Sequence, residues 1–285
     1  MAVVGGLVWR FGDRVLDCSE RTFVMGILNV TPDSFSDGGR FLASDAAVDH
    51  AVRMVADGAD VIDVGGESTR PGSDPVSVEE ETARVVPVVA ALAGAVPDTP
   101  ISIDTRKVAV AAAALDVGAT IVNDVSAGGD PEMFPLVAGR GAGIVLMHMK
   151  GEPKTMQETA AYRDVVAEVR EHLRERVEAA RAAGIEPERI AVDPGIGFGK
   201  ELEHNLELIR RIDALTELGR PVLVGPSRKR FLGTILNVPE DRRVEGTIAA
   251  VVWMVSRGAN LVRVHDVLEV VRAVRVADAI AGSGP

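Results

Sequence analysis

The chain has 285 residues, of which 47% are hydrophobic and 26% charged, a balance typical of a globular protein that buries one large core. Its formal net charge of −11 argues against a general nucleic-acid surface, because binding to phosphate backbones needs a broad basic face. A lone Cys18 excludes an internal disulfide and a cysteine-based metal site, and no apolar stretch approaches the roughly 20 residues that cross a bilayer. We therefore expect a cytoplasmic protein.

The first element along the chain is expected to be a β-hairpin within residues 1–18. Glycine-containing turns at 5–6 and 12–13 separate short apolar runs there. Eight further apolar runs follow, each short enough to be a buried strand. They cover residues 24–28, 61–64, 101–103, 120–122, 144–147, 190–192, 222–224 and 261–264.

A segment of helical character lies between each pair of successive runs. In the fifth such segment, Val165, Val169, Leu173 and Val177 recur every four residues and form one apolar stripe. A stripe of this kind predicts a helix that packs one face on a sheet. Helices are expected at 44–57, 78–92, 106–117, 131–140, 160–183, 202–218, 241–257 and 266–281.

This alternation of strands and helices predicts the fold class. Alternating units give a parallel sheet, and eight of them close into a (β/α)8 TIM barrel, an α/β fold of about 250 residues. We expect residues 1–285 to form a single domain, with 1–18 as an N-terminal hairpin and 280–285 as a flexible tail.

Polar clusters follow the apolar runs directly, where the strands of such a barrel carry its active site. A strand does not need these residues for its own stability. The connections 30–43 and 65–77 are long and rich in Gly, Pro, Ser and Asp, and we expect them to act as lids. The clusters begin at Asn29, Gly65, Asp104, Asn123, His148, Asp193, Ser227 and His265.

Basic residues gather at three of these strand ends although the chain is acidic. They are Arg70, the run 228–230, and Arg263 with His265. Any one of them alone could be a solvated surface charge. Basic residues at three strand ends together predict a positively charged site for a small anionic substrate at this end of the barrel.

Eight segments at these strand ends carry specific motifs. The two longest read Met-Gly-Ile-Leu-Asn-Val-Thr-Pro-Asp-Ser-Phe-Ser-Asp-Gly-Gly at 25–39 and Gly-Glu-Ser-Thr-Arg-Pro-Gly at 66–72. The others are Ser-Ile-Asp-Thr at 102–105, Asn-Asp at 123–124, Met-His-Met at 147–149, Asp-Pro-Gly-Ile-Gly-Phe-Gly-Lys at 193–200, Ser-Arg-Lys at 227–229 and Arg-Val-His-Asp at 263–266. In this order, over essentially the whole chain, they closely resemble the bacterial dihydropteroate synthase family.

The resemblance implies a transferase of folate biosynthesis. It would join 4-aminobenzoate to 6-hydroxymethyl-7,8-dihydropterin diphosphate, giving 7,8-dihydropteroate and pyrophosphate. Asp193 and Asn123 would then bind the amino-pyrimidine side of the pterin, Asp104 would support the opposite edge, and Lys229 would bond its carbonyl and ring nitrogen. Met147 would belong to the same site. A single Asp at a strand end can instead be a helix N-cap.

For the diphosphate, the resemblance implies binding by Asn29, Arg70, Arg263 and His265, with Mg²⁺ held by Asn29 and the phosphate oxygens. Catalysis would then consist of stabilising the leaving group. Asp37, on the first long loop, would face a transient pterin cation. The residues expected to act in catalysis are Asp37, Arg70, Lys229, Arg263 and His265.

The second substrate, 4-aminobenzoate, needs a slot for its ring and an anchor for its carboxylate. The backbone N–H groups of a short helical turn after Ser227 are one such anchor. Pro226 departs from the family pattern beside this slot, which puts sulfonamide sensitivity in doubt. The family resemblance implies that Phe35, Thr69, Pro71, Phe198 and Ser227 line the slot.

Two other functions stay open from the sequence. One is a pterin-dependent methyltransferase that transfers a methyl group to a corrinoid protein, which would not need the motifs at 66–72 and 227–229. The other is a non-catalytic pterin-binding paralogue, in which Asn29, Arg70 or His265 should be altered. The family resemblance also implies a homodimer. Small-molecule substrates are expected as partners, without nucleic acid or membrane.

Overall fold

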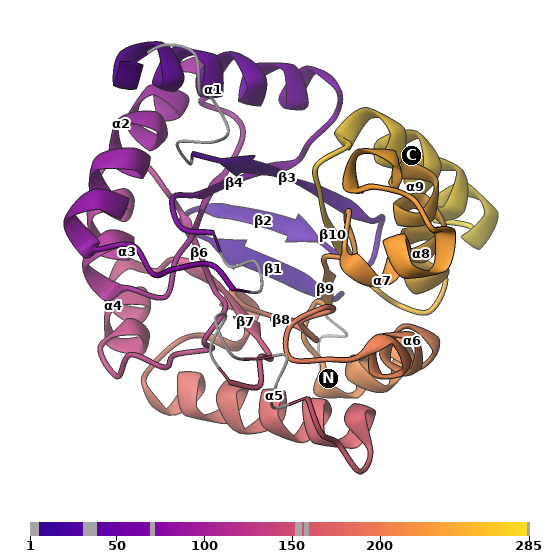
Figure 1. Ribbon diagram of the computed structural model, residues 1–285. Coiled ribbons are helices and arrows are strands. Elements are labelled where there is room, and N and C mark those ends of the chain that lie inside the picture. Colours follow the sequence, from indigo (N-terminus) through magenta and orange to yellow (C-terminus); the bar gives the residue numbers. More distant parts are fainter. Residues whose placement is uncertain (1–5, 31–38, 69–71, 152–155, 157–159, 284–285) are drawn as a thin grey trace.

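A barrel of parallel strands forms the centre of the protein (Figure 1). The computed structural model describes residues 6–30, 39–68, 72–151, 156 and 160–283, and only the backbone of 39–44. Within this part of the chain, eight strands pair in the order β8-β7-β6-β5-β4-β3-β10-β9, and a parallel bridge between Val192 and Val222 joins the two ends of the series. The strands are β3 (Phe23–Asn29), β4 (Val61–Gly65), β5 (Ile101–Asp104), β6 (Ile121–Asp124), β7 (Gly143–Met147), β8 (Ile190–Asp193), β9 (Leu223–Val224) and β10 (Leu261–Val264).

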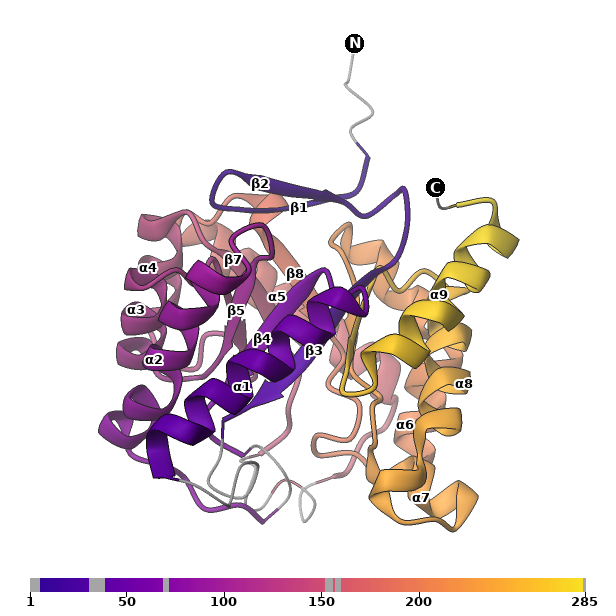
Figure 2. The ribbon, with the colours of Figure 1, turned by 90° about the horizontal axis from the view of Figure 1, so that it is seen from above.

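Helices cover the outside of the barrel (Figures 1 and 2). The stripe Val165, Val169, Leu173 and Val177 is buried on α5, as its spacing predicts. The helices are α1 (Gly39–Ala56), α2 (Val78–Ala95), α3 (Val108–Asp116), α4 (Met133–Arg140), α5 (Val165–Ala182), α6 (Leu202–Arg210), α7 (Arg230–Leu236), α8 (Val244–Val255) and α9 (Val267–Ala281), with short 3-10 turns η2 (Pro187–Arg189), η3 (Ile212–Leu218) and η4 (Glu240–Arg242).

The (β/α)8 fold expected from the sequence is confirmed, with shifts at some helix ends. The predicted helix 131–140 begins at Met133, because the N–H of Met133 bonds the carbonyl of Asp130 in a turn that occupies Pro131 and Glu132. The predicted helix 202–218 changes to 3-10 geometry after Arg211. Turn geometry at a helix end depends on hydrogen bonds that periodicity does not report.

The barrel interior has an apolar layer and a polar layer. Alternate strand residues point to opposite faces, and Ile62, Val64, Ile101 and Ile103 belong to the core between barrel and helices. The other set points inward. Near the strand starts this inward set is apolar and comprises Phe23, Met25, Val61, Ile121, Val145, Ala191, Leu223 and Leu261. Towards the strand ends it becomes polar and includes Asp63, Ser102, Asp104, Asn123, Asp193 and Arg263.

The N-terminal hairpin lies across the end of the barrel where the strands begin (Figure 2). Its strands β1 (Val8–Phe11) and β2 (Arg14–Asp17) are antiparallel, which confirms the expected hairpin. Trp9 and Phe11 are fully buried against the apolar layer of the barrel, and Trp9 Nε1 donates to the carbonyl of Arg189 at 3.1 Å. The hairpin therefore seals this end, and the polar layer faces the opposite end. None of the helices in the described part of the chain combines the length and apolarity needed to span a bilayer.

Candidate active site

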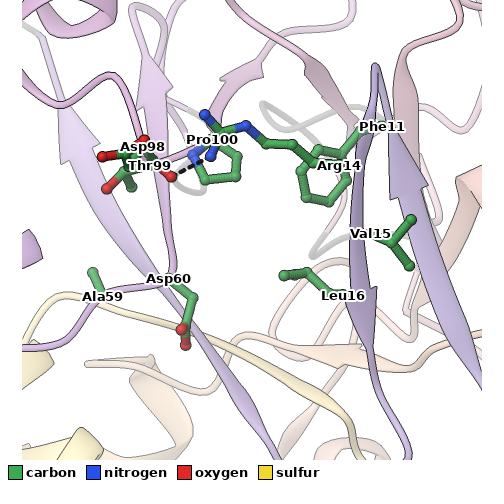
Figure 3. Close-up of a pocket in the computed structure, with 9 residues that line it drawn as sticks. All are labelled: Phe11, Arg14, Val15, Leu16, Ala59, Asp60, Asp98, Thr99 and Pro100. Carbon is green, nitrogen blue, oxygen red and sulfur yellow. Dashed lines mark hydrogen bonds between the residues drawn. The ribbon is translucent and has the colours of Figure 1, made fainter.

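Two cavities differ in what they could bind. One, of about 430 Å³, lies between the hairpin and the segments that precede β4 and β5 (Figure 3). Its arginine, Arg14, already donates to the backbone carbonyls of Pro97, at 2.6 Å, and Asp98. The other cavity, of about 890 Å³, lies at the C-terminal ends of the strands. It brings together Asn29, Asp104, Asn123, Met147, Asp193, Phe198, Ser227, Lys229, Arg263 and His265, all named above from the sequence.

A hydrogen-bonded network of four side chains forms one wall of the larger cavity and the layer beneath it. Arg263 Nη2 donates to Asp104 Oδ2 at 2.7 Å, and Arg263 Nε donates to Asp63 Oδ2 at 2.6 Å. Asn123 Nδ2 donates to the same oxygen of Asp63 at 3.0 Å. Asp104 is thus joined to Arg263 directly, and Asn123 is joined to Arg263 through Asp63, a residue not expected in the site from the sequence.

Burial dominates the electrostatics of this network. It raises the pKa of the Asp104 carboxyl to about 7, while Arg263 acts in the opposite direction and Asp63 adds to the rise. Burial alone would lower the pKa of Arg263, but attraction by Asp63 and Asp104 outweighs it and raises that pKa above its usual value. Arg263 therefore stays charged between two carboxylates.

Asp193 stands at the end of β8, held by the loop that follows it. Its Oδ1 accepts from the backbone N–H of Gly195 at 2.7 Å. Burial raises its pKa to about 6, and the Gly195 hydrogen bond and the charge of Lys229 oppose this rise. Gly195 has φ +66°, and a Cβ there would lie 2.0 Å from the carbonyl oxygen of His148. Only glycine allows this close approach, which keeps Asp193 facing the cavity.

A buried ammonium group fastens the same loop to the end of β7. Lys200 Nζ donates to the carbonyls of Gly195 at 3.0 Å, Phe198 at 2.9 Å and His148 at 3.3 Å, and lies 2.9 Å from His148 Nδ1. Burial lowers the pKa of Lys200 to about 7. Burial, with the charge of Lys200, lowers the pKa of His148 to about 2, so the ring is neutral and its Nδ1 can accept.

Replacing Lys200 with methionine should lower the free energy of unfolding by about 2–3 kcal/mol, because it removes a buried donor that three backbone carbonyls share. Chemical denaturation measures the change. Lys150→Met is the matched control, since Lys150 also donates to one carbonyl, that of Ala161, but lies more exposed. If both substitutions lowered the free energy of unfolding equally, Lys200 would not have the role of stabilising the loop that follows β8.

Ser227 and His265, from the ends of β9 and β10, contact each other. The backbone N–H of His265 donates to Ser227 Oγ at 3.1 Å, and that oxygen lies 3.0 Å from His265 Nδ1. Next to them, Arg228 adopts φ +56° and binds Asp266 through two hydrogen bonds, one of them from Nε at 3.1 Å. The Arg228–Asp266 ion pair couples the two strand ends and supports the unusual backbone of Arg228.

An apolar wall completes the cavity. Phe198 packs with Val125, Met147 and Met156 in a small cluster separate from the barrel core. Lys229 Nζ lies 3.9 Å from the centre of the Phe198 ring, within cation–π range. A flat ring with polar edges would find both apolar and charged partners here.

Five residues named from the sequence, Phe35, Asp37, Thr69, Arg70 and Pro71, lie outside the described residues. The segment that leads towards three of them is anchored: Glu67 pairs with Lys107, which also binds the buried carboxylate of Glu81. Pro226 is buried and is not among the described residues that line the cavity, and its carbonyl accepts from the N–H of Lys229 at 3.2 Å.

Comparison with known proteins accounts for this combination of fold and site. Residues 25–265 match the family described as pterin binding enzyme. The chain is 48% identical over 271 residues to a dihydropteroate synthase of Synechocystis sp., with 94% of this chain and 93% of that one covered. It is 48% identical over 256 residues to the Escherichia coli dihydropteroate synthase, covering 90% of each. The chain belongs to the dihydropteroate synthase family.

Solved structures of dihydropteroate synthases agree with this membership. The Yersinia pestis dihydropteroate synthase with a sulfonamide drug complex superposes with a TM-score of 0.91 at 44% identity, covering 97% of this chain and all of that one. The Xanthomonas albilineans dihydropteroate synthase with 4-aminobenzoic acid gives the same TM-score and identity, covering 98% of this chain and all of that one. The family resemblance and the transferase class expected from the sequence are thereby confirmed.

Two buried polar residues of this dihydropteroate synthase family member escaped the sequence analysis as parts of the site. Asp63 interrupts the apolar run 61–64, and a charged residue inside a buried strand is a signal that can be read from the sequence. Lys200 ends a glycine-rich motif that was recognised, but nothing in its spacing shows that its ammonium turns inward. The structure supplies both.

Proposed function

We propose that this chain condenses 6-hydroxymethyl-7,8-dihydropterin diphosphate with 4-aminobenzoate. The amine nitrogen forms a bond to the pterin methylene carbon, the bond from that carbon to the diphosphate oxygen breaks, and the amine loses a proton. The products are 7,8-dihydropteroate and pyrophosphate. The observation that carries the proposal is a single cavity that joins three pterin-compatible groups, Asp104, Asn123 and Asp193, to the cations Lys229 and Arg263.

The carboxylates and the amide suit the edges of a reduced pterin. Such a ring presents an amino group and ring N–H donors on one side, and Asp193 with Asn123 offers acceptors for them. Asp104 supports the opposite edge, and Lys229 donates to the carbonyl and ring nitrogen. Each charge-assisted hydrogen bond contributes about 1.5–3 kcal/mol in a dry site. Met147 and its apolar neighbours supply a surface on which the flat ring packs.

The diphosphate is assigned to the mouth beside Asn29, Arg263 and His265, with Arg70 from the second long loop. Asn29 offers an amide oxygen to Mg²⁺, and Gly65 leaves room between this oxygen and Asp104: a Cβ there would lie 3.8 Å from Asn29 Oδ1 and 3.6 Å from Asp104 Oδ2. The described residues contain no group of three His, Cys, Asp or Glu side chains suited to a metal. One hard oxygen fits Mg²⁺ because that ion keeps waters and takes substrate phosphates.

Catalysis is electrostatic in this proposal. An arylamine is a weak nucleophile, and the pterin methylene can delocalise positive charge, so departure of pyrophosphate precedes or accompanies attack. Arg263, Arg70 and His265 are assigned to stabilising the charge of the leaving group, Lys229 to orienting the pterin, and Asp37 to stabilising the transient cation. When bound, Mg²⁺ would neutralise further charge on the phosphate oxygens. Closure of the two long loops, which the start of α1 and the end of β4 limit to residues 30–38 and 66–77, would exclude water from the cation.

The 4-aminobenzoate slot is assigned to the side of the cavity at Phe198 and Ser227, with Phe35, Thr69 and Pro71 from the long loops. Ser227 is buried and lies against His265, so the slot adjoins the diphosphate site, as a direct transfer requires. A sulfonamide would compete for this slot. Pro226 changes the backbone behind Ser227 rather than the lining, so altered sulfonamide sensitivity stays a prediction.

The test is formation of dihydropteroate from the two substrates by the purified protein. Removal of Mg²⁺ with a chelator should lower kcat at least about 100-fold, because the metal would supply several kcal/mol of charge stabilisation, and excess Mg²⁺ should restore it. Chromatography of dihydropteroate and a pyrophosphate assay measure the two products. Full activity without metal would reject the role of Mg²⁺. Saturable pterin binding with no product would favour the corrinoid methyltransferase or the non-catalytic paralogue.

We also propose a homodimer formed through the last helices. Exposed apolar side chains concentrate there: Trp253 on α8 is 46% exposed, and Val276 and Ile280 on α9 are 60% and 83% exposed. Isolated surface residues need no partner, but several on adjacent helices favour an interface. A cytoplasmic location stays a prediction from the sequence.

A further inference from the structure

Asp63 is buried beneath the candidate active site without lining it. It lies in the middle of β4, its side chain is fully buried, and it is not among the described residues that form the cavity wall. A charged residue in the interior of a barrel costs stability unless its partners compensate. Its partners therefore indicate what it does.

Both partners of Asp63 line the cavity. Asp63 Oδ2 accepts from Arg263 Nε at 2.6 Å and from Asn123 Nδ2 at 3.0 Å. Because the oxygen beside Asn123 acts as an acceptor, the amide atom that faces it must be the nitrogen. The amide oxygen of Asn123 is then directed away from Asp63 and is left to accept from a ligand. Without this contact the amide could turn over and present a donor instead.

The same oxygen orients Arg263. Its Nε is held by Asp63 and its Nη2 by Asp104, so two of the three guanidinium nitrogens are fixed and the plane of the group is defined. Nη1 is engaged by neither carboxylate. The guanidinium is therefore set in one orientation before substrate binds, which lowers the cost of organising the site.

The other oxygen of Asp63 has no such partner. Among the described residues, Asp63 Oδ1 is buried without a hydrogen bond, as is Oγ of Ser102, its neighbour on β5. An unsatisfied buried oxygen costs about 1–3 kcal/mol. A carboxylate selected for stability alone would be replaced by an apolar residue here, so all of its hydrogen bonding serves the two cavity residues.

We propose that Asp63 is a positioning residue for the pterin: it sets Asn123 as an acceptor and holds Arg263 in one plane. This inference rests on the proposed function, since the ligand edge it prepares is that of the pterin diphosphate. The 4-aminobenzoate slot at Phe198 and Ser227 has no hydrogen bond to Asp63, so its affinity should not depend on this residue.

Asp63→Asn tests the proposal by steady-state kinetics with each substrate varied in turn. The nearly isosteric amide keeps the volume but removes the negative charge that holds Arg263. Because one end of an amide donates and the other accepts, it also no longer determines which atom of Asn123 faces it. KM for the pterin diphosphate should rise and kcat/KM should fall by about 10- to 100-fold, a loss like that found when a residue that orients a metal ligand is removed. KM for 4-aminobenzoate should stay within about twofold. If Asp63→Asn does not fold, Asp63→Ser takes its place.

Asp278→Asn is the matched control. Asp278 is also a buried carboxylate with two hydrogen bonds, from the N–H of Thr22 at 3.0 Å and its Oγ1 at 2.8 Å, but it lies at the opposite end of the barrel. Asp278→Asn should lower the melting temperature, and the KM values for the pterin diphosphate and for 4-aminobenzoate should stay unchanged. A double mutant of Asp63→Asn with Asn123→Ala should lose less kcat/KM than the product of the single losses, because both act on one contact.

Three results would overturn the proposal: an unchanged pterin KM in Asp63→Asn, an equal rise of both KM values, or losses that multiply in the double mutant. All three results are compatible with normal turnover by the wild-type protein. Failure of the wild type to make dihydropteroate would instead reject the proposed function, so the two failures are distinguishable.

Discussion

Replacing Arg263 with methionine should have the largest effect of any single substitution in the described site. It leaves the carboxylates of Asp63 and Asp104 buried at one point without their cation. Loss of one member of a buried ion pair costs about 3–5 kcal/mol of folding stability. Loss of a positive group at the leaving diphosphate should also lower kcat/KM by about 10³-fold. Denaturant titration and steady-state kinetics measure the two effects separately.

An arginine at the other end of the barrel provides the control for Arg263. Arg21 binds Asp60 with a 2.6 Å ion pair, and the Arg21 side chain is 39% exposed against 19% for Arg263. Arg21→Met should cost less stability, because exposed pairs contribute about 1 kcal/mol or less, and it should leave kcat/KM unchanged. Arg263→Lys should recover part of the stability but little of the activity, because an ammonium cannot reach both carboxylates and the substrate. Normal kinetics in Arg263→Met would contradict the assigned role.

Replacing Asp193 with asparagine should lower kcat/KM for the pterin diphosphate by about 10²–10³-fold, because the carboxylate offers acceptors to two donors of the pterin at once. Its pH dependence gives a sharper test. Asp193 and Asp104 have pKa values raised by burial to about 6 and about 7, and the contacts proposed for the pterin need both carboxylates ionised. In the wild type, kcat/KM should therefore fall as pH drops below about 7 and fall more steeply below about 6.

Asp193→Asn removes one of the two titrating groups. Its kcat/KM should keep a single decline near pH 7, about tenfold per unit, without the steeper part below pH 6. Titration of the substrate phosphates acts on both proteins, so the ratio of wild type to variant isolates Asp193. Asp124→Asn is the control, because Asp124 is also a buried carboxylate at a strand end but accepts from the N–H groups of its own loop, at Ser126 and Gly128. A wild-type pH profile in Asp193→Asn would reject the assignment.

Much of the molecule is determined locally by its sequence. Each strand is a short apolar run closed by a polar cluster, and α5 shows its buried face in the spacing of four valines and leucines. These features depend on neighbours within a few residues, so the barrel, the hairpin and the end of the barrel that carries the site can be predicted without coordinates. The motifs at the strand ends also predict the family and ten of the described residues that line the larger cavity.

Side-chain partnerships required the tertiary structure. Arg263 binds Asp63 and Asp104 across 200 and 159 positions in the sequence, and Asn123 binds Asp63 across 60. Each contact exists because parallel register brings alternate residues of different strands to the same height inside a closed barrel. The spacing of residues within one segment does not show at which level along the barrel axis they meet residues of another strand.

The inward turn of Lys200 is a second feature that only the fold decided. From the sequence it is a lysine after a glycine-rich loop, a setting in which lysine is usually exposed. Its burial follows from the close contact of that loop with the end of β7, where backbone carbonyls converge on one point. The motifs at the strand ends are enough to show which residues lie at the mouth of the barrel. Which of them share a hydrogen bond depends on the folded arrangement, because the energy of a buried charge depends on all the groups that surround it.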